Sequence, residues 1–521
     1  MTLLDYSKVN DDTPILVGCS QHIDKQGTEG LNYLEILEIV SKKAIDDCKA
    51  KVSLIDHLDA ISIIRFVADT PNRDTTTSNM WGYPNMPRSL NNSLGANISQ
   101  EIYTATGGNS PQLAINEIAL RIKSGDINCA LIAGGEALDT FVSRLKSGKK
   151  IDWSDDPGGT PEIIGSIREG SSEHEKLHGL YDPSVVYPLF ANGLRGKQGQ
   201  TIEEHMHEIG RLFSSFSKVA SENEYAWFPL HRTANEISTI KPENRMVGFP
   251  YTKYMNSIMR VNQSSALIMT SAKKARELGI PESKWIFLNS GACINEIWNV
   301  TERVNFYSSP AIKKCVNSVL EMANIKQEEI HYLDIYSCFP CAVQIAIQEI
   351  GIEPDDPRGL TLTGGLPYFG GPGNAYVLHS IASLMDKLRK NPGKNGLLTA
   401  NGWYLTKHGA GVFSSAPFEG DWNQIVDTSS MQLEINELSH PELLESLTGE
   451  GIIETYTISH SRNGPQKAII VGKLENGKRF LANSYESEEL LVMMNQEMLN
   501  AKVEVKSDGK RNIFKLKRKI I

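Results

Sequence analysis

The pattern of apolar and polar positions predicts strands and helices in alternation along most of the chain. Residues 13–21 form an apolar run that ends in a turn, as expected for a buried strand. Residues 33–49 then carry apolar side chains at helical spacing, and residues 53–64 form a second apolar run of the strand type. This alternation is typical of an α/β fold with parallel or mixed sheets.

The segment 331–350 shows how one strand gives way to a helix. Tyr332 and Leu333 lie among β-favouring residues, and Pro340 suits the first turn of a helix, where its missing N–H group is not needed. Ligands of open α/β proteins bind at such strand ends. The polar side chains at this corner are those of Tyr336, Ser337, Cys338 and Cys341. The alternative is a buried corner with two inert thiols.

Two parts of the chain repeat the same local pattern. The stretch IDHLDAIS at 55–62 matches IHYLDIYS at 330–337, and the helix before each contains AI-x-x-C, at 44–48 and 311–315. A helix, a strand and a glycine-ended loop then follow in both parts. The repetition predicts two related α/β halves packed about a pseudo-two-fold axis, with helices between and outside their sheets.

We divide the chain into four parts. The first half comprises 1–139 with 255–300, and the second half comprises 301–435. Between them, 140–254 is a long polar and aromatic insertion, which is either a binding segment or a helical cover over a sheet face. The segment 447–521 contains short alternating runs separated by Asn-Gly and Asp-Gly turns, plus one helix. This pattern is typical of a small OB-like β barrel.

Composition and charge limit the binding partners and the cellular compartment that we expect. The 521 residues are 22% charged with a net charge of −9, so no general attraction to nucleic acid or membranes is expected. The basic C-terminal tail could bind single-stranded nucleic acid, but this part of the chain has few aromatic side chains on which bases could stack. Seven scattered cysteines, an acidic start and no apolar run of bilayer length favour a cytoplasmic protein.

Several motifs, in order, resemble the thiolase superfamily, and most closely its degenerate type-1 thiolase-like branch, often named acetyl-CoA acetyltransferases. The motifs are TPILVGCSQ, GGNSPQLAIN, YAWFPLHRTANEI, ENRMVGFPYTKYM, IYSCFPCAVQ, TLTGGLPYFGGPGNAYV and GWYLTKHGAGVFS. The resemblance implies a five-layered αβαβα core of two halves, an inserted loop domain and a small C-terminal β domain. It also implies a monomer or homodimer with a coenzyme A thioester as ligand or substrate and no bound cofactor.

The residues that this family uses for catalysis are missing. The resemblance places Gly108 where thiolases have their nucleophilic Cys, Gly371 where they have the activating His, and Asn401 where they have a second Cys. Without an activated thiolate, the covalent acyl-enzyme route has no attacking atom. Ordinary thiolase activity is therefore not expected.

Other polar groups remain in the matching motifs. Tyr336 stands at the Asn or His of the thiolase oxyanion-hole motif, and it resembles the Tyr of the retro-aldolases of steroid side-chain degradation. Its phenol could donate a hydrogen bond or a proton to a thioester, or the ring could pack in the core. His408 could act as the missing base or cap a loop. Lys407 could meet a phosphate or only solvent.

The turn at 107–110 is expected to present helix-start N–H groups to an oxyanion, with Gly108 and Asn109 at its centre. Ser110 before Pro111 is expected to cap that helix. The candidate substrate-binding residues are Ser110, Cys338, Gly371, Asn374, Asn401 and Lys407. Cys338-x-x-Cys341 lacks the second Cys pair or the His pair of a metal site, so no metal is predicted.

Two functions stay open. The first is an enzyme that makes or breaks a carbon–carbon bond, or transfers an acyl group, on an acyl-CoA without a covalent intermediate, using Tyr336 and His408 for proton transfer. The second is a non-catalytic binder of CoA esters or lipids. The missing thiol and imidazole favour the binder, whereas the surviving Tyr and His favour the enzyme.

Overall fold

The computed structural model describes residues 4–70 and 81–517. In this part of the chain the core is one mixed ten-stranded sheet in the order β12-β13-β14-β11-β1-β10-β5-β2-β4-β7. Its strands are β1 (Pro14–Ile23), β2 (Ala60–Ile63), β4 (Gln100–Thr104), β5 (Cys129–Ala137), β7 (Glu162–Ile164), β10 (Asn262–Ser271), β11 (Ile286–Asn295), β12 (Tyr332–Asp334), β13 (Asn395–Gly402) and β14 (Lys407–Ser414). A separate small sheet pairs β3 (Trp81–Gly82) with β6 (Trp153–Ser154).

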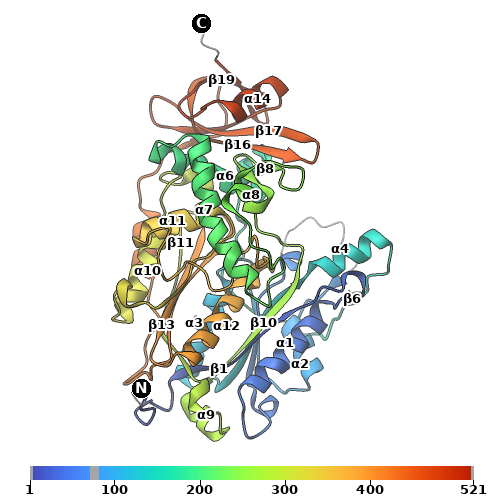
Figure 1. Ribbon diagram of the computed structural model, residues 1–521, viewed down its shortest axis with the longest axis vertical. Helices are drawn as coiled ribbons and strands as arrows, with labels where there is room; N and C mark the ends of the chain where they lie inside the picture. Colours follow the sequence, from blue (N-terminus) through green and yellow to red (C-terminus); the bar gives the residue numbers. More distant parts are fainter. Residues whose placement is uncertain (1–3, 71–80, 518–521) are drawn as a thin grey trace.

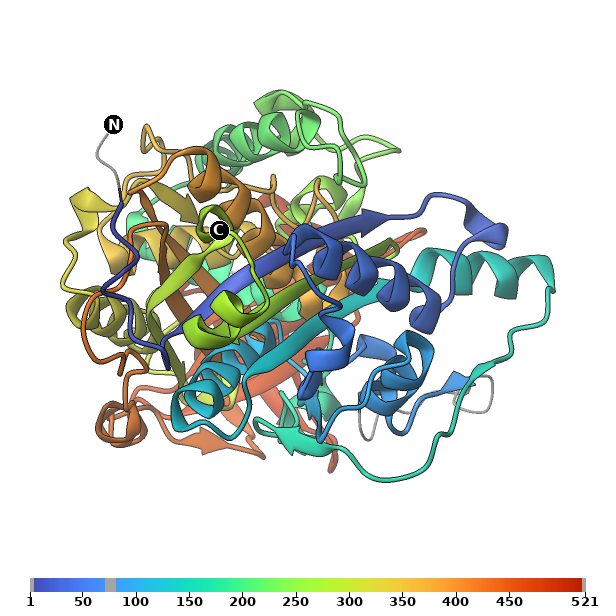
Figure 2. The same cartoon turned by 90° about the horizontal axis from the view of Figure 1, so that it is seen from below.

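The strand pairing repeats itself on the two sides of the core. The order β2-β5-β10-β1 has one parallel and two antiparallel pairings, and β12-β13-β14-β11 has the same series. The two sets meet where Ile15 and Leu16 of β1 pair with Phe287 and Ile286 of β11. Seen from below, β1 and β10 run side by side (Figure 2). The predicted pair of related α/β halves is confirmed.

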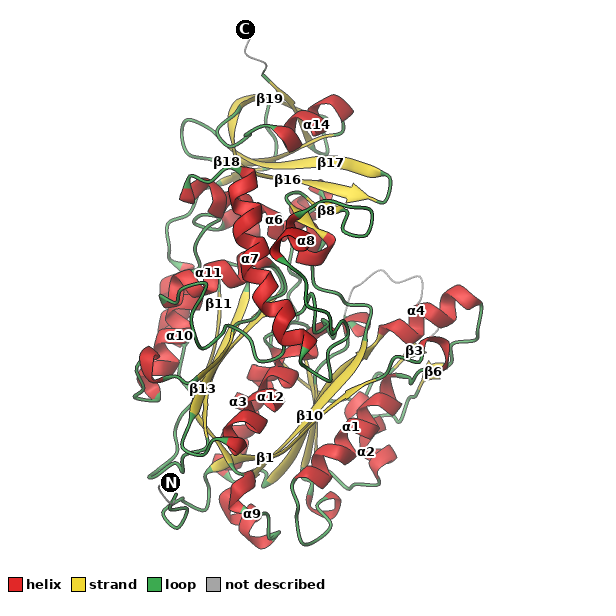
Figure 3. Cartoon of the chain, viewed as in Figure 1, coloured by secondary structure: helices red, strands yellow, loops and turns green. Residues whose placement is uncertain are grey.

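Helices separate and cover the two sides of this sheet (Figure 1). Between the sides lie α3 (Ser110–Ser124) and α12 (Tyr376–Lys390), which contact strands of both. The outer face of one side carries α1 (Tyr33–Asp47) and α2 (Met86–Leu94), and that of the other carries α10 (Pro310–Met322) and α11 (Pro340–Ile350) (Figure 3). The short helix α9 (Ala272–Glu277) follows β10. This is the five-layered arrangement that the resemblance to the thiolase superfamily implies.

Local sequence accounts for most element boundaries. Helix α1 begins at a capping box in which Asn32 and Glu35 each accept the other's main-chain N–H, and it buries Ile36, Leu37 and Val40. The predicted strand at 53–64 is wrong in its first half: Ile55–His57 form a 3₁₀ turn, and only β2 is extended. Leu54 and Leu58 are buried as parts of that turn, so apolar character alone mimicked a longer strand.

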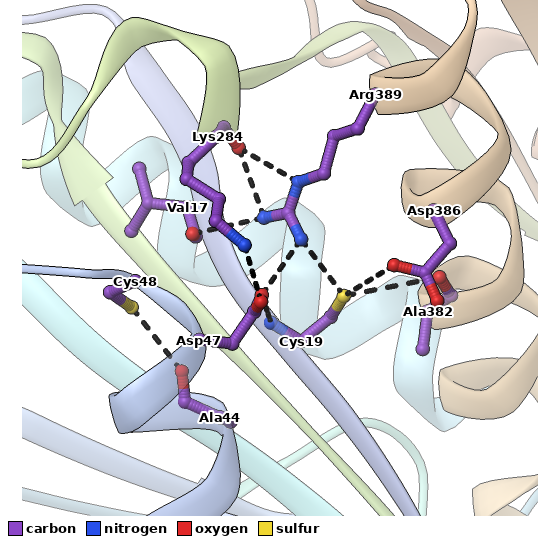
Figure 4. A network of polar contacts seen from close by, with 9 residues as sticks. All are labelled: Val17, Cys19, Ala44, Asp47, Cys48, Lys284, Ala382, Asp386 and Arg389. Atoms are coloured by element: carbon purple, nitrogen blue, oxygen red, sulfur yellow. Dashed lines mark hydrogen bonds and ion pairs between the residues drawn. The ribbon is translucent and has the colours of Figure 1, made fainter.

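An ion-pair network fastens α12 to α1 and β1 (Figure 4). Arg389 donates to Asp47 at 2.7 Å and to the carbonyl of Val17 at 2.9 Å, and Lys284 donates to the other oxygen of Asp47 at 2.5 Å. Burial raises the pKa of Asp47, but the Arg389 and Lys284 cations outweigh it and hold that pKa below its usual value. The Cys19 thiol also contacts Arg389, and burial raises its pKa, so it stays protonated.

The insertion begins with α4 (Leu138–Ser147), which lies at the side of the first half and contacts β10 (Figure 3). After it come α5 (Glu173–His178), α6 (Pro183–Gln198), α7 (Ile202–Ser221), α8 (Ala234–Ser238), β8 (Met246–Gly248) and β9 (Tyr251–Thr252). Of these, α6, α7, α8 and β8 lie between the core and the C-terminal part of the chain (Figure 3). Helix α6 packs on α11 and on β16. The residue limits proposed for the four parts of the chain stay predictions.

The C-terminal part forms a second sheet and a second core, to which β8 and β9 of the insertion also belong. Helix α13 (Ser429–Asn436) leads into this part and packs on α10 and β11 of the first core. The elements of the C-terminal part itself are β15 (Leu443–Leu444), β16 (Gly449–Ser461), β17 (Gly464–Lys473), β18 (Arg479–Ser484), α14 (Ser487–Asn495), β19 (Lys502–Ser507) and β20 (Asn512–Leu516). Residues such as Tyr456, Ile470 and Phe480 are fully buried there. The predicted strands, tight turns and single helix are confirmed. The last basic residues, 518–521, lie outside the described part.

Buried polar side chains join this C-terminal domain to the rest. Arg479 is fully buried; it donates to the carbonyls of Thr301 and Arg303 and pairs with Glu454. His178 of α5 is also fully buried: its Nδ1 bonds the carbonyl of His174 at 2.9 Å, and the main-chain N–H of Asn512 donates to its Nε2 at 3.2 Å. Burial lowers the pKa of His178 to about 4, so its imidazole is neutral.

Every helix in the described part of the chain is too short or too polar to cross a bilayer.

Candidate active site at the start of helix α3

The turn before α3 is held by a residue of the other half. Gly107 takes a positive φ of 152°, and its N–H donates to Oδ1 of Asn374 at 3.0 Å. The Nδ2 of Asn374 in turn donates to the carbonyl of Arg65 at 2.7 Å. Both ends of this predicted substrate-binding side chain are therefore committed to main-chain groups, and Asn374 positions the turn.

Ser110 does not cap the helix, contrary to the sequence prediction. The N-cap is Asn109, without a side-chain capping bond, and Ser110 is the first helical residue. Its hydroxyl donates backward to the carbonyl of Ala105 at 2.7 Å, and its N–H donates to the carbonyl of Gly107. Within the described residues the N–H groups of Gly108 and Asn109 have no acceptor, and Oδ1 of Asn109 is buried without a partner.

Tyr336 occupies the space in front of Gly108. A Cβ atom at position 108 would lie 2.3 Å from the Tyr336 hydroxyl and 2.4 Å from the main-chain oxygen of Asn401. The N–H of Tyr336 donates to Thr399, and its ring meets Tyr376 edge-on at 5.6 Å. Burial holds the pKa of Tyr336 well above its usual range, so the phenol is a hydrogen-bond donor and not a base.

The other two replaced positions are also closed. At Gly371 a Cβ atom would lie 2.2 Å from the Ser257 hydroxyl, so no imidazole fits without rearrangement. Asn401 donates from Nδ2 to the Tyr187 hydroxyl at 2.8 Å and to the sulfur of Cys338 at 3.7 Å. Its Oδ1 is buried and has no partner in the described structure.

The two cysteines of the C-x-x-C motif are ordinary thiols. Burial raises the pKa of Cys338 to about 12, although Tyr187 and the helix-start N–H groups oppose it. Burial also raises the pKa of Cys341, whose thiol donates to the carbonyl of Tyr187 at 3.3 Å. Neither forms a disulfide, and the described residues contain no group of three metal-ligating side chains. Cys338 therefore contributes polar contact and not redox chemistry.

His408 is buried and electrically neutral. Its Nε2 lies 3.1 Å from the carbonyl of Leu405, which can only accept, so Nε2 carries the proton and Nδ1 holds the lone pair. Burial, with the Arg303 cation nearby, lowers the pKa of His408 to about 3. An imidazole with so low a pKa is a weak base, so it suits accepting a hydrogen bond better than removing a proton from carbon.

Lys407 is buried and does not face solvent. Its Nζ donates to the carbonyls of Thr106 and Ser166, each at 2.8 Å, and lies 5.6 Å from the centre of the Trp298 ring. Only 4% of the residue is exposed. Burial lowers the pKa of Lys407 to about 8.

The turn between β13 and β14 carries backbone strain. Trp403 and Leu405 have φ angles of 54° and 53°, a region that bulky residues rarely adopt. Arg303 holds the turn by donating to the carbonyls of Tyr404 and Leu405, and the hydroxyl of Tyr187 donates to the carbonyl of Trp403 at 2.7 Å. Sequence reasoning missed Tyr187 and Arg303, because neither lies in a motif near the site.

A small cavity connects these groups. It is lined by Tyr336, Thr399, Asn401, Leu405 and His408 together with apolar side chains of α10 and α11. Its volume is about 20 Å³, enough for one water molecule. The structure thus brings Tyr336, Asn401 and His408 to one cavity, and Gly108 packs against the Tyr336 hydroxyl. An acyl chain needs more room, so its entry requires movement.

Comparison with known proteins fits this geometry. Residues 430–510 match the family model described as the additional C-terminal domain of thiolase-like protein type 1. A monomeric SCP2-thiolase-like protein type 1 from Mycobacterium smegmatis is 31% identical, with a TM-score of 0.83, and the match covers 98% of this chain and 100% of that one. The chain belongs to the type 1 thiolase-like proteins. No curated protein sequence matches it.

More distant structures share the fold of this type 1 thiolase-like protein. The dimeric peroxisomal thiolase of Saccharomyces cerevisiae is 13% identical, with a TM-score of 0.56, and the match covers 78% of this chain and 98% of that one. The Ltp2–ChsH2(DUF35) aldolase is 16% identical over the same shares, with a TM-score of 0.55. The part of this chain left uncovered is consistent with its additional C-terminal domain.

Proposed function

We propose that this type 1 thiolase-like protein binds an acyl-CoA thioester with its carbonyl oxygen at the N–H groups of Gly108 and Asn109. The observation that carries the proposal is the pair of N–H groups without acceptors at the start of α3, beside the donor hydroxyl of Tyr336. Donors fixed in this way stabilise negative charge that develops on a carbonyl oxygen. Structures of the same fold include an acetyl-CoA acetyltransferase and a 3-ketoacyl-CoA thiolase, which supports this class of ligand.

The chemistry that such a site favours is enolate formation. A polarised thioester carbonyl acidifies the neighbouring carbon, so a carbon–carbon bond can break or form there without an acyl-enzyme. Tyr336, a neutral phenol, donates to the oxyanion. Covalent acyl transfer through residue 108 is not part of the proposal, because glycine offers no nucleophile and Tyr336 fills the space. The likeness in fold to an aldolase is in keeping with this reaction class.

A second candidate is a binder of CoA esters or lipids without turnover. The low pKa of His408 favours it, because the imidazole is then too weak a base for proton abstraction. The binder and the enzyme use the same oxyanion contacts and differ only in whether a base acts.

The test uses the full chain and a panel of acyl-CoAs and 3-ketoacyl-CoAs. Thermal shift reports binding, and analysis of products reports turnover. We expect Tyr336→Phe to weaken both and His408→Ala to change turnover little. Binding without turnover would reject the enzyme and support the non-catalytic binder. The absence of a thermal shift with every CoA species would reject both candidates.

A further inference from the structure

Lys407 is a buried cation without a counter-ion. No carboxylate among the described residues lies within ion-pair distance of its Nζ, and its acceptors are the two main-chain carbonyls of Thr106 and Ser166. Buried lysines are normally paired with a carboxylate, because an uncompensated ammonium is costly in a dry interior. If Lys407 only anchored these main-chain carbonyls, an uncharged hydrogen-bond donor would serve equally well.

The side chain lies beside the proposed thioester site. A Cβ atom at Gly107 would touch both Cδ of Lys407, at 3.3 Å, and Oδ1 of Asn109, at 2.4 Å. The lysine stem and the Asn109 amide oxygen, which is buried and has no hydrogen-bond partner in the described structure, thus both pack closely against Gly107. The lysine therefore flanks the same turn as Gly108 and Asn109.

A short surface segment and the Trp298 ring cover Lys407. Ser166 supplies one of the two carbonyl acceptors, and the neighbours Gly165, Ile167 and Arg168 are all exposed. Arg168 lies over the Trp298 ring, with its Cζ 4.9 Å from the ring centre. Displacing this short segment would free one hydrogen bond of Nζ and expose the amine beside the turn that precedes α3.

We propose that Lys407 is the nucleophile of a carbonyl-binding site and forms a Schiff base with a ketone or aldehyde brought to the start of α3. The 3-keto group of a 3-ketoacyl thioester is the substrate class that fits; this part rests on the proposed function. The free amine adds to the carbonyl carbon, and loss of one water leaves a C=N bond in place of C=O. The protonated imine then accepts the electron pair of a C–H bond on the neighbouring carbon C2, which gives an enamine as that proton passes to water.

The protonation state of Lys407 suits this role. Burial lowers its pKa to about 8, so roughly a quarter of the side chain is the free amine at pH 7.5, whereas an ordinary lysine of pKa about 10.4 is almost wholly charged. Lys467 of β17 is a matched reference, because burial and the Arg511 cation also lower its pKa, yet it lies in the C-terminal domain.

The experiment traps the imine by reduction. The full chain is incubated at pH 7.5 with acetoacetyl-CoA or with glyceraldehyde, borohydride is added, and peptides are examined by mass spectrometry. Hydride addition to the imine carbon fixes a secondary amine whose mass exceeds that of lysine by the ligand less one oxygen atom. We expect the adduct on Lys407 at least tenfold above Lys467, and its loss in Lys407→Arg but not in Lys467→Arg.

The outcomes separate the two proposals. An adduct on Lys407 from glyceraldehyde but not from acetoacetyl-CoA supports the nucleophile and counts against the thioester site. Labelling of Lys407 no stronger than that of Lys467 overturns the inference, as does an N-acyl lysine at 407 in place of the reduced imine. Melting curves show whether Lys407→Arg is folded, and the mapping in the native chain is decisive without any variant.

Discussion

Adding a single carbon at residue 108 tests the packing that separates this protein from a working thiolase. In Gly108→Ala the new Cβ would lie 2.3 Å from the Tyr336 hydroxyl and 2.4 Å from the carbonyl of Asn401, whereas ordinary contacts begin near 3.4 Å. Each neighbour must therefore move by about 1 Å. Overpacking of this kind costs about 1–3 kcal/mol, and we expect the upper end, because the Asn401 oxygen belongs to the main chain of β13.

A double-mutant cycle with Tyr336→Phe measures how much of the cost of Gly108→Ala comes from the Tyr336 hydroxyl. Removing the hydroxyl relieves the 2.3 Å contact but leaves the ring carbon Cζ at 2.8 Å and the carbonyl of Asn401 in place. We therefore expect Gly108→Ala to cost about 1 kcal/mol less in the Tyr336→Phe background. For the same reason Gly108→Cys should destabilise the chain without restoring thiolase activity.

The assay is thermal unfolding of the four proteins, repeated with acyl-CoA present. A chain of several domains need not unfold in one step, so the transition shifted by the ligand is the one to follow. The reasoning is refuted if Gly108→Ala melts with the native protein, or if Tyr336→Phe leaves its cost unchanged.

Three further changes test other parts of the structure. His178 has a folded-state pKa of about 4 against 6.5, so the unfolded chain takes up the proton first and about 3 kcal/mol of stability is lost as the pH falls from 6.5 to 4; His178→Gln should flatten that slope in melting curves, and equal slopes would contradict the assignment. Arg389→Met should lower stability by less than about 3 kcal/mol, because Asp47 keeps its second cation; a neutral result in denaturant unfolding would count against the network. Tyr187→Phe should cost about 1–3 kcal/mol and weaken acyl-CoA binding measured by calorimetry, whereas Tyr368→Phe, whose hydroxyl has no partner in the described structure, should change neither.

Elements governed by local sequence could be predicted well. Turn pairs such as Asn463-Gly464 and Asn476-Gly477 fixed the C-terminal strands, because glycine there takes a positive φ. The repeated IDHLDAIS and IHYLDIYS stretches revealed the two halves. The strand at 53–64 was too long in prediction, because apolar residues in a 3₁₀ turn look like strand residues.

The details of the site depend on contacts between distant residues, which periodicity does not encode. That Tyr336 fills the space in front of Gly108, or that Ser257 closes Gly371, follows only from the packed halves. Of the two alternatives for Lys407, contact with solvent is wrong, because a segment of the insertion buries it, and the course of that segment has no regular sequence pattern. Asn374 lies in a family-like motif, yet its role in holding the turn needed coordinates.

The buried Arg479 has a consequence for anyone who wishes to shorten this protein. Its guanidinium donates to the carbonyl of Arg303. The guanidinium of Arg303 in turn donates to the strained turn that precedes Lys407 and His408. Truncation before residue 440 would remove Arg479, so the carbonyl of Arg303 would lose this donor. The contact of Arg303 with the turn would then be less firmly held. The C-terminal domain should therefore be exchanged between related proteins only together with the core residues that it contacts.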